Sequence, residues 1–422
     1  MDEYKLHRHI LCIDLKSFYA SVECAERHLD PFKTPLVVAD AGRGGGSIVL
    51  AVSPYLKSLG IPSRLRFYEL PENVDMIVAK PRMSLYLEYS AKIIEVYLKF
   101  ISEDDLYVYS VDEAFLDVTE YLNYYQMTDV ELAKKILETI YHETKLFATV
   151  GIGPNMLISK LALDIESKKA PDFIARWDYE DIPKKLWPIE PLSEMWGIGY
   201  HMQKRLNRLG LIKIGDIANY SVLELKRQFG ILGEELYYHT HGIDMSMIQH
   251  KHQVRSKSKS YGIGQTLFSD YYVPDVFQII IEMVDDVSRR LRLSHKVAKT
   301  IHLGIAYSKE VGGGFSRQIT LEQPTSSEKT IYEICLALFD KYYDKGTPIR
   351  RVHVSASNLQ KAYVYQFSLF EDPERLLKEH NLFQTVDEMK FKYGRNAVNR
   401  ASTELETSTA KARNKMIGGH HA

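Results

Sequence analysis

Two adjacent acids stand near the middle of the strand-forming run Tyr107-Val108-Tyr109-Ser110-Val111-Asp112-Glu113-Ala114-Phe115-Leu116-Asp117. Successive side chains of a regular strand point to opposite faces of its sheet. Asp112 and Glu113 can therefore face one site only if the backbone turns there. We expect a hairpin bend at these two residues, joining strands near 106–111 and 114–118.

A third acid, Asp14, lies in an earlier apolar run, Ile10-Leu11-Cys12-Ile13-Asp14-Leu15-Lys16-Ser17-Phe18-Tyr19. Three carboxylates at the ends of buried strands suit a pair of Mg²⁺ ions, because hard cations prefer oxygen ligands. Two such ions clamp the attacking and leaving oxygens of an in-line phosphoryl transfer. Each acid alone also has an ordinary explanation: a solvated Glu113, a turn cap at Asp112 and a helix N-cap at Asp14.

The bulk composition is that of a soluble globular protein, with 45% hydrophobic and 26% charged residues. Its 422 residues predict two to four domains. No apolar run approaches the roughly 18 residues of a membrane span, and the first residues do not resemble a signal peptide. Cys12, Cys24 and Cys335 lack CxxC spacing, which predicts reduced thiols, a cytoplasmic location and no zinc site.

With a net charge of −1, the chain as a whole is not basic, as nucleic-acid-binding proteins usually are. A basic surface for nucleic acid could therefore only be local. No acid occurs from Met245 to Ser269, a stretch that contains Lys251, Arg255, Lys257 and Lys259. We interpret residues 248–260 as a basic linker. It is either a solvated tether or a strand that follows a DNA backbone.

The order of elements predicts an α+β protein of several domains. Residues 1 to about 170 alternate short strands with helices, and residues 171–245 are mostly helical. After the linker, strands and helices follow in the order βαββαβ, which predicts a ferredoxin-like small domain. In the first part we expect strands at 9–14, 35–39, 47–52, 75–79, 106–111, 114–118 and 147–152, and helices near 17–28, 54–59, 82–102 and 129–143. In the last part we expect strands at 261–267, 297–307, 315–322 and 349–357, and helices at 274–292 and 326–344.

Two lysines are candidate phosphate ligands. Lys160 lies in the run 150–162, which reads as a strand, a glycine turn and a helix, and helix N-termini favour anions. The run lacks the ending of a Walker A loop and could equally be an ordinary βα turn. Lys57 follows a shorter helix start and, taken alone, is a solvated lysine.

The glycines of Met195-Trp196-Gly197-Ile198-Gly199 predict a hairpin between two helices. Such glycines let backbone N–H groups approach phosphate oxygens, which gives contacts with DNA of any sequence. Similar hairpins also join helices without any ligand. Phe18 and Tyr19, so close to Asp14, either pack against the sugar of a bound nucleotide or fill a core.

A short apolar peptide, Gln366-Phe367-Ser368-Leu369-Phe370, follows the last predicted domain. Burial of Leu369 and Phe370 in a partner's groove would contribute about 1.5–3 kcal/mol each, enough for a weak docking motif. The alternative is a strand that packs on its own domain. Farther on, basic residues could meet DNA or a recombinase filament: Lys390, Lys392, Arg395, Arg400, Lys411, Arg413 and Lys415.

The chain resembles the Y-family translesion DNA polymerases of the UmuC-like (UvrX-type) bacterial branch, from about Ile10 to about Leu359. Four motifs carry the resemblance in order: 13–23, 109–117, 151–162 and 197–216. It implies a right-hand polymerase with a palm, small fingers, a helical thumb containing a helix-hairpin-helix, and a little finger. The implied domains are palm 1–20 and 75–170, fingers 21–74, thumb 171–247, linker 248–260, little finger 261–360 and a C-terminal extension 361–422.

The resemblance also implies roles for single residues. Two Mg²⁺ ions, for which Mn²⁺ can substitute, would be held by Asp14, Asp112, Glu113 and the carbonyl of Leu15. Tyr19 would be the steric gate against a ribose 2′-OH, with Phe18 beside the nucleotide. The remaining implied contacts are Lys57 and Lys160 with the triphosphate, Gly197, Gly199, Lys257 and Lys259 with DNA, and Gln366, Leu369 and Phe370 with a sliding clamp.

The implied reaction is template-directed synthesis from primer-template DNA and dNTPs across damaged bases, with low fidelity and no proofreading. Two alternatives stay open. One is a non-catalytic DNA-binding repair scaffold that recruits partners through its tail, and the other is a nucleotide cyclase. The chain departs from the family at Pro54 and Lys57, where many relatives carry Tyr and Arg, and at 168–172, where Lys-Lys-Ala-Pro-Asp replaces a Lys-Pro-Asn-Gly ending.

Overall fold

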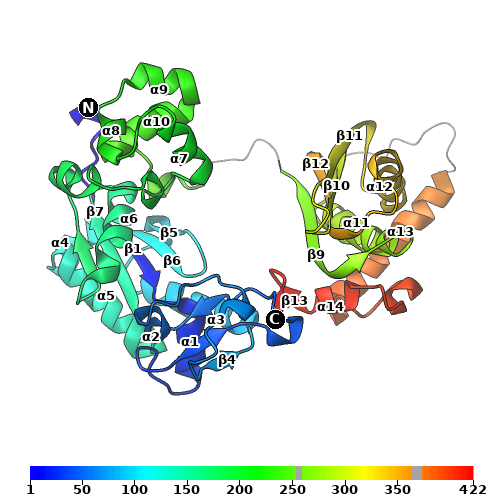
Figure 1. The fold of residues 1–422 in the computed structure, drawn as a ribbon, viewed down its shortest axis with the longest axis horizontal. Helices are drawn as coiled ribbons and strands as arrows, with labels where there is room; N and C mark the ends of the chain where they lie inside the picture. The colour runs from blue at the N-terminus through cyan, green and yellow to red at the C-terminus, as the bar shows by residue number, and fades with distance from the viewer. Residues whose placement is uncertain (253–258, 363–372, 422) are drawn as a thin grey trace. The chain divides into compact units, whose positions relative to one another are not determined.

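The computed structural model describes residues 1–252, 259–362 and 373–421. The chain forms two compact units, Met1–Val254 and Arg255–Ala422 (Figure 1). Their boundary falls inside the predicted linker. Residues 248–252 belong to the first unit, because Ile248 is buried and Lys251 donates to the carbonyl of Leu106 at 2.6 Å. The predicted linker, 248–260, therefore begins too early in the chain.

A five-stranded sheet forms the centre of the first unit, in the order β5-β6-β1-β7-β8. The middle strand, β1, is antiparallel to both neighbours, and all its residues except Asp14 are buried. Helices α5 and α6 pack on β7, and α3 packs on α5. The bounds are β1 Ile10–Leu15, β5 Leu106–Val108, β6 Glu113–Asp117, β7 Ala148–Gly153, β8 Ile174–Arg176, α3 Met83–Tyr97, α4 Leu122–Tyr125, α5 Asp129–Thr144 and α6 Met156–Ile165.

Two glycines allow α6 to lie close to β7. A Cβ on Gly151 would stand 2.1 Å from the carbonyl oxygen of Ser159, and one on Gly153 would stand 2.6 Å from the nitrogen of Ser159. Real Cβ atoms do not approach backbone atoms so closely. The glycine pattern of this strand therefore sets the position of α6 and of the side chains that α6 carries.

A smaller three-stranded sheet, β3-β2-β4, lies beside the first helices of this unit. Strand β4 is part of this sheet, although it lies beyond residue 74, where the predicted fingers end. Val37, Val52 and Leu56 are fully buried in its core. The bounds are β2 Leu36–Val38, β3 Ala51–Val52, β4 Ile77–Ala79, α1 Phe18–Glu26 and α2 Pro54–Ser58.

The last part of the first unit is helical. Its core gathers Trp177, Leu186, Leu206 and Leu225, all of which are buried. The segment before the glycine hairpin is only a short 3-10 helix, Leu192–Glu194, rather than the regular helix that we expected. The helices that follow are α7 Tyr200–Asn207, α8 Ile214–Ala218, α9 Val222–Phe229 and α10 Ile231–Thr240.

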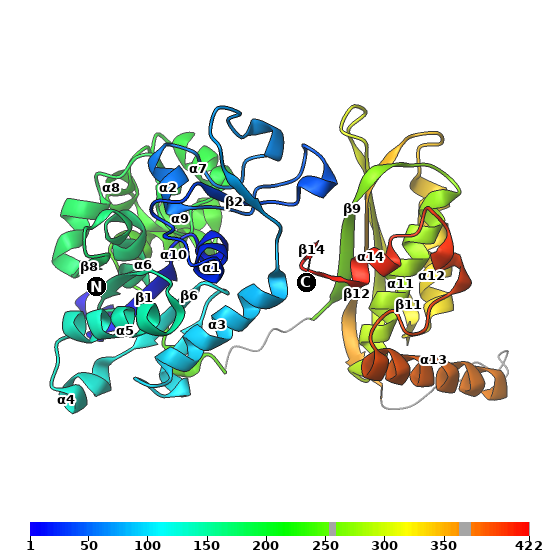
Figure 2. The ribbon, with the colours of Figure 1, turned by 90° about the horizontal axis from the view of Figure 1, so that it is seen from below.

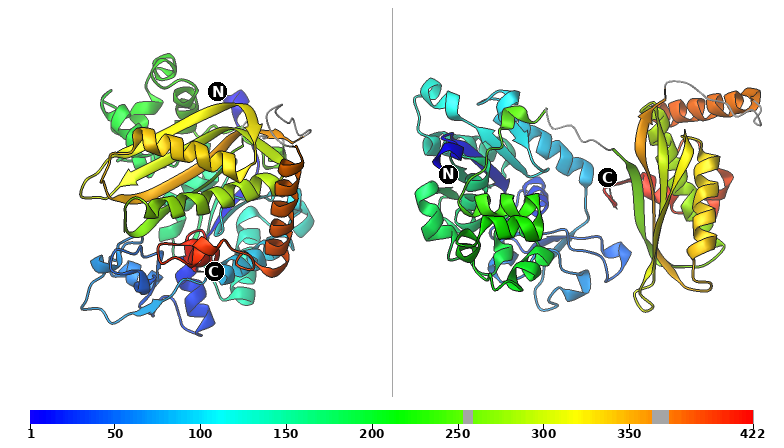
Figure 3. Two further views of the ribbon diagram at one scale, coloured as in Figure 1. Left: turned by 90° about the vertical axis from the view of Figure 1, so that its right-hand side faces the viewer. Right: turned by 90° about the horizontal axis from the view of Figure 1, so that it is seen from above.

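The second unit contains an antiparallel sheet in the order β11-β10-β12-β9. The chain order is βαββαβ, as predicted, and each helix joins two strands that flank a third. Both helices lie on one face of the sheet (Figure 3). The bounds are β9 Tyr261–Tyr271, α11 Asp275–Leu293, β10 Lys296–Tyr307, β11 Gly314–Thr325, α12 Glu328–Tyr342 and β12 Ile349–Lys361.

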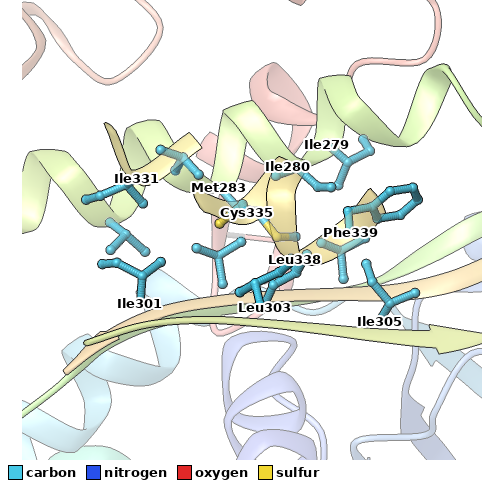
Figure 4. Close-up of a cluster of buried hydrophobic side chains, with 14 of the residues drawn as sticks. Ile279, Ile280, Met283, Ile301, Leu303, Ile305, Ile331, Cys335, Leu338 and Phe339 are labelled. Carbon is cyan, nitrogen blue, oxygen red and sulfur yellow. The ribbon is translucent and has the colours of Figure 1, made fainter. Parts of the chain in front are cut away.

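The core of this unit lies between the two helices and the sheet. Alternate residues of β10 point toward the helices, as the burial pattern of a one-sided sheet requires. Figure 4 shows Ile301, Leu303 and Ile305 of β10 facing Ile279, Ile280 and Met283 of α11 and Cys335, Leu338 and Phe339 of α12.

The C-terminal extension packs on the back of α11 through ion pairs (Figure 2). Five of its basic residues, which we considered as partners for DNA or a recombinase filament, are paired within the unit. The pairs are Lys390–Asp285, Arg395–Asp286, Arg400–Glu328, Arg413–Glu282 and Lys411–Glu404. The bounds are α13 Pro373–Tyr393, α14 Ala410–Asn414, β13 Met416–Ile417 and β14 His420–His421.

None of the described helices combines the length and the apolar character that crossing a lipid bilayer requires.

Candidate active site

Strands β1 and β6 place two of the predicted acids opposite each other. Asp14 and Glu113 are cross-strand partners, and the next pair is Leu15 with Asp112. The N–H of Leu15 donates to the carbonyl of Asp112 at 2.9 Å. Because hydrogen-bonded and non-hydrogen-bonded pairs alternate, Asp14 and Glu113 form a non-hydrogen-bonded pair, in which side chains on one face lie close together.

The predicted bend is present before Glu113. Strand β5 ends at Val108, and the N–H groups of Tyr109 and Ser110 both donate to the carbonyl of Glu113, each at 3.0 Å. Asp112 lies in this bend and accepts a hydrogen bond from the hydroxyl of Ser110 at 2.7 Å. The bend frees Asp112 from the alternation of a regular strand.

Two lysines neutralise these acids in an alternating chain of charges, which we call the strand-end cluster: Asp14, Glu113, Lys160, Asp164 and Lys168. Helix α6 supplies Lys160 and Asp164, and Lys168 follows one turn later. The ammonium of Lys160 lies 2.7 Å from Glu113 and 3.1 Å from Asp164. The ammonium of Lys168 lies 2.7 Å from Asp164 and 3.1 Å from Asp14.

The cluster concentrates negative charge at the end of β1. Burial raises the pKa of Asp14 to about 6, Lys168 opposes the shift, and the charges of Asp112 and Glu113 add to it. Asp14 in turn raises the pKa of Lys168, although burial alone would lower it. The carboxylates therefore repel one another and depend on nearby cations.

Within residues 1–252, 259–362 and 373–421, no three acidic, histidine or cysteine side chains converge tightly enough to hold one metal ion. Lysine ammoniums stand against Asp14 and Glu113 instead. The donor set still suits a divalent cation, because Asp14 and Glu113 present carboxylate oxygens on one face of a sheet. A bound cation would replace Lys168 beside Asp14.

Phe18 and Tyr19 follow Asp14 through a tight turn. Ser17 has the left-handed conformation, with φ of 49°, and α1 begins at the next residue. Phe18 is buried, whereas Tyr19 is half-buried and stacks on Tyr86. Burial, and then the charge of Asp112, raises the pKa of Tyr19, so its hydroxyl is within electrostatic reach of the acids.

The two predicted phosphate ligands differ in their surroundings. The side chain of Lys160 is only 7% exposed and is held between two carboxylates. Burial lowers the pKa of Lys57, while the charge of Asp14 opposes this shift and that of Lys168 adds to it. Lys57 therefore lies near the same cluster, although no ion pair holds it among the described residues.

The glycine hairpin presents open backbone. Gly197 has φ of +93°, and Gly199 is the N-cap of α7. A Cβ on either residue would meet nothing within 4 Å. Lys259 is exposed, whereas Lys257 and the peptide residues Gln366, Leu369 and Phe370 lie outside the described residues.

Sequence reasoning missed three residues near the acids: Asp164, Lys168 and Tyr86. Asp164 could have been found, because it lies four residues after Lys160 on the same helix, and Lys168 continues this spacing beyond the end of the helix. Lys168 appeared only as a departure from a family ending. Tyr86 gave no local signal, since its contact with Tyr19 depends on how α3 packs against α1.

Comparisons with known proteins identify the family of this chain. The impB/mucB/samB family matches residues 13–164, its C-terminal domain matches residues 258–369, and the HHH motif of the same family matches residues 179–211. UvrX of Bacillus subtilis, a protein named for UV-damage repair, is 42% identical over 98% of this chain and 97% of its own. DNA polymerase IV 2 of Halalkalibacterium halodurans is 33% identical over 98% of this chain and 99% of its own.

A solved structure supports the fold. A Y-family DNA polymerase chimera of Dbh and Dpo4 matches with a TM-score of 0.65 and 23% identity, over 84% of this chain and 99% of the chimera. The fold is that of a right-hand polymerase with palm, fingers, thumb and little finger. The chain belongs to the impB/mucB/samB family, the UmuC-like branch of the Y-family DNA polymerases.

Proposed function

We propose that this protein is a template-directed DNA polymerase that extends primers across damaged bases. The observation that carries the proposal is the pairing of Asp14 with Glu113 across β1 and β6, with Asp112 in the adjoining bend. Membership of the Y family supports it. Synthesis with low fidelity and without proofreading is part of the proposal.

In this proposal Asp14, Asp112, Glu113 and the carbonyl of Leu15 hold two Mg²⁺ ions. When bound, such ions would lower the pKa of the primer 3′-hydroxyl and would neutralise charge on the α-phosphate and the leaving pyrophosphate. Lys160 keeps Glu113 in place, because it is buried against that carboxylate. Lys57 and Lys160 contact the triphosphate, and Lys168, whose side chain is 40% exposed, is a further candidate for the same role.

The other predicted contacts complete the proposal. Tyr19 excludes a ribose 2′-hydroxyl, and Phe18 packs beside the nucleotide. The open backbone at Gly197 and Gly199 holds a DNA phosphate, since nothing crowds either residue. Lys257 and Lys259 follow the DNA backbone. A sliding clamp binds Gln366, Leu369 and Phe370, and a recombinase filament remains a candidate partner of the extension.

Primer extension with purified protein tests the proposal. With an annealed primer-template, dNTPs and Mg²⁺, we expect template-directed addition by the wild type and none by Asp112→Ala. A scaffold would bind the duplex without extending it, and a cyclase would consume a nucleotide without needing DNA. Extension by Asp112→Ala at the wild-type rate would end the assignment.

A further inference from the structure

Two tyrosine–glutamate bridges join α3 to α1. The hydroxyl of Tyr86 donates to Glu23 at 2.7 Å, and the hydroxyl of Tyr89 donates to Glu26 at 2.8 Å. The two bridges are offset by three residues on both helices, which is about one turn. They have the same chemistry, but of the two tyrosines only Tyr86 has a ring contact with Tyr19.

The carboxylate of the first bridge is firmly anchored. Glu23 is fully buried, and Arg82 donates to both of its oxygens, at 3.0 Å and 2.7 Å. Arg27 donates to it as well. Although burial alone would raise it, the hydrogen bonds from Arg82 hold the pKa of Glu23 below its usual value. The hydroxyl of Tyr86 is thus bound to a fixed, ionised acceptor.

The ring of Tyr86 forms a wall behind Tyr19. The two rings are stacked, with centroids 4.4 Å apart and planes 16° from parallel. Tyr86 is 1% exposed and cannot move without breaking its bond to Glu23. Tyr19 is half-buried, so its own position depends on the surface that it rests against.

We propose that Tyr86, fixed by Glu23 and Arg82, is a positioning residue that sets how strictly Tyr19 excludes ribonucleotides. This inference rests on the proposed polymerase function. A gate discriminates one hydroxyl group only if its ring stays where that hydroxyl would lie. A ring without a wall behind it would tilt away and admit the larger sugar.

The test measures kcat/KM for one dNTP and for the matching rNTP in single-nucleotide primer extension by the full-length protein. We expect Tyr86→Leu to reduce the preference for dNTP by about 10-fold or more, mainly through faster rNTP incorporation. Tyr86→Phe keeps the ring but breaks its bond to Glu23, so it should lose a smaller but measurable part of the preference. Tyr89→Phe, which removes the second bridge alone, should behave as the wild type.

A general loss of structure would lower incorporation of both nucleotides and leave their ratio unchanged, which would overturn the inference. A preference in Tyr86→Leu equal to that of the wild type would overturn it too. If Tyr86→Leu does not fold, the ratio for Tyr86→Phe against Tyr89→Phe decides, and equal ratios in both would count against it. Tyr19→Ala distinguishes failure of this inference from failure of the proposed function. If Tyr19→Ala admits ribonucleotides while Tyr86→Leu still excludes them, only the positioning role of Tyr86 is rejected. If the wild type does not extend a primer at all, the polymerase function itself is rejected.

Discussion

Each unit contains a cluster of neighbouring carboxylates whose mutual repulsion is offset by basic side chains, and the two clusters use different cations. The strand-end cluster sets Lys160 and Lys168 against carboxylates at the end of β1 and at the start of β6. The second, which we call the helix-back cluster, joins Glu282, Asp285, Asp286 and Glu328 to Lys390, Arg395, Arg400 and Arg413. Three of its four cations are arginines.

The type of cation distinguishes the strand-end cluster, where a bound ion can replace a lysine, from the helix-back cluster, where the ion pairs are permanent. Arginine presents a rigid fork of donors and stays charged, whereas lysine is a flexible point charge. The carboxylate of Asp14 is 19% exposed, so a cation from solution can reach it and take the place of Lys168. The carboxylates of Glu282 and Glu328 are 2% exposed and have no such access. We infer that the first cluster takes divalent ions and that the second holds the extension on its domain.

The largest effect is expected from Glu113→Gln in the strand-end cluster. The substitution keeps the size of the side chain but removes a charge on which the proposed ions depend. Single-nucleotide incorporation should fall about 1,000-fold or more, as for other groups that stabilise transition-state charge. Circular dichroism should stay as in the wild type. A fall of less than 10-fold in a normally folded variant would contradict a role in catalysis for the strand-end cluster, which would then be structural like the helix-back cluster.

The opposite pattern is expected for Glu282→Ala in the helix-back cluster. Its carboxylate accepts from the N–H of Thr409 at 3.2 Å and pairs with Arg413 at 3.4 Å. Loss of one partner of a buried ion pair costs about 3–5 kcal/mol. Hydrogen exchange in residues 405–415 should accelerate, while nucleotide incorporation on short templates stays normal. Unchanged exchange there would show that the cluster does not hold the extension.

A smaller effect is expected from Gly151→Ala, which tests how the strand-end cluster is positioned. The added Cβ would stand 2.1 Å from the carbonyl of Ser159 and would push α6 away from β7. Overpacking of this kind costs about 1–3 kcal/mol, measured as a lower free energy of unfolding. Gly46→Ala is the control, because its Cβ would meet nothing within 4 Å. Equal stability of the two variants would contradict the close approach of α6.

The sequence predicted most strands because their signals are local, but it missed β8 and made β3, expected at 47–52, too long. Apolar runs placed β1, β6 and β7 within one or two residues of their observed bounds, and the βαββαβ order of the second unit followed from alternating patterns. The bend at Asp112 could be predicted because two adjacent acids cannot share a face of a regular strand. The strand expected at 106–111 ends at Val108 for the same reason.

Side-chain partners that depend on packing were harder to predict. Nothing near Lys168 in the chain indicates Asp14, which lies 154 residues earlier. The basic residues of the extension resembled free DNA contacts, because their acidic partners lie about 70 to 130 residues away. Long-range ion pairs leave no periodic trace in a sequence, so charge patterns alone overestimate free basic surface.

Binding of Mn²⁺, followed by electron paramagnetic resonance, tests the central contrast most directly. The full-length protein is titrated in the presence of a dideoxy-terminated primer-template and the next dNTP, so that no reaction occurs. We predict that the wild type and a Glu282→Gln/Asp286→Asn variant bind two Mn²⁺ ions equally well. The Asp14→Asn/Glu113→Gln variant should lose this binding. Undiminished Mn²⁺ binding by the Asp14→Asn/Glu113→Gln variant would contradict the account.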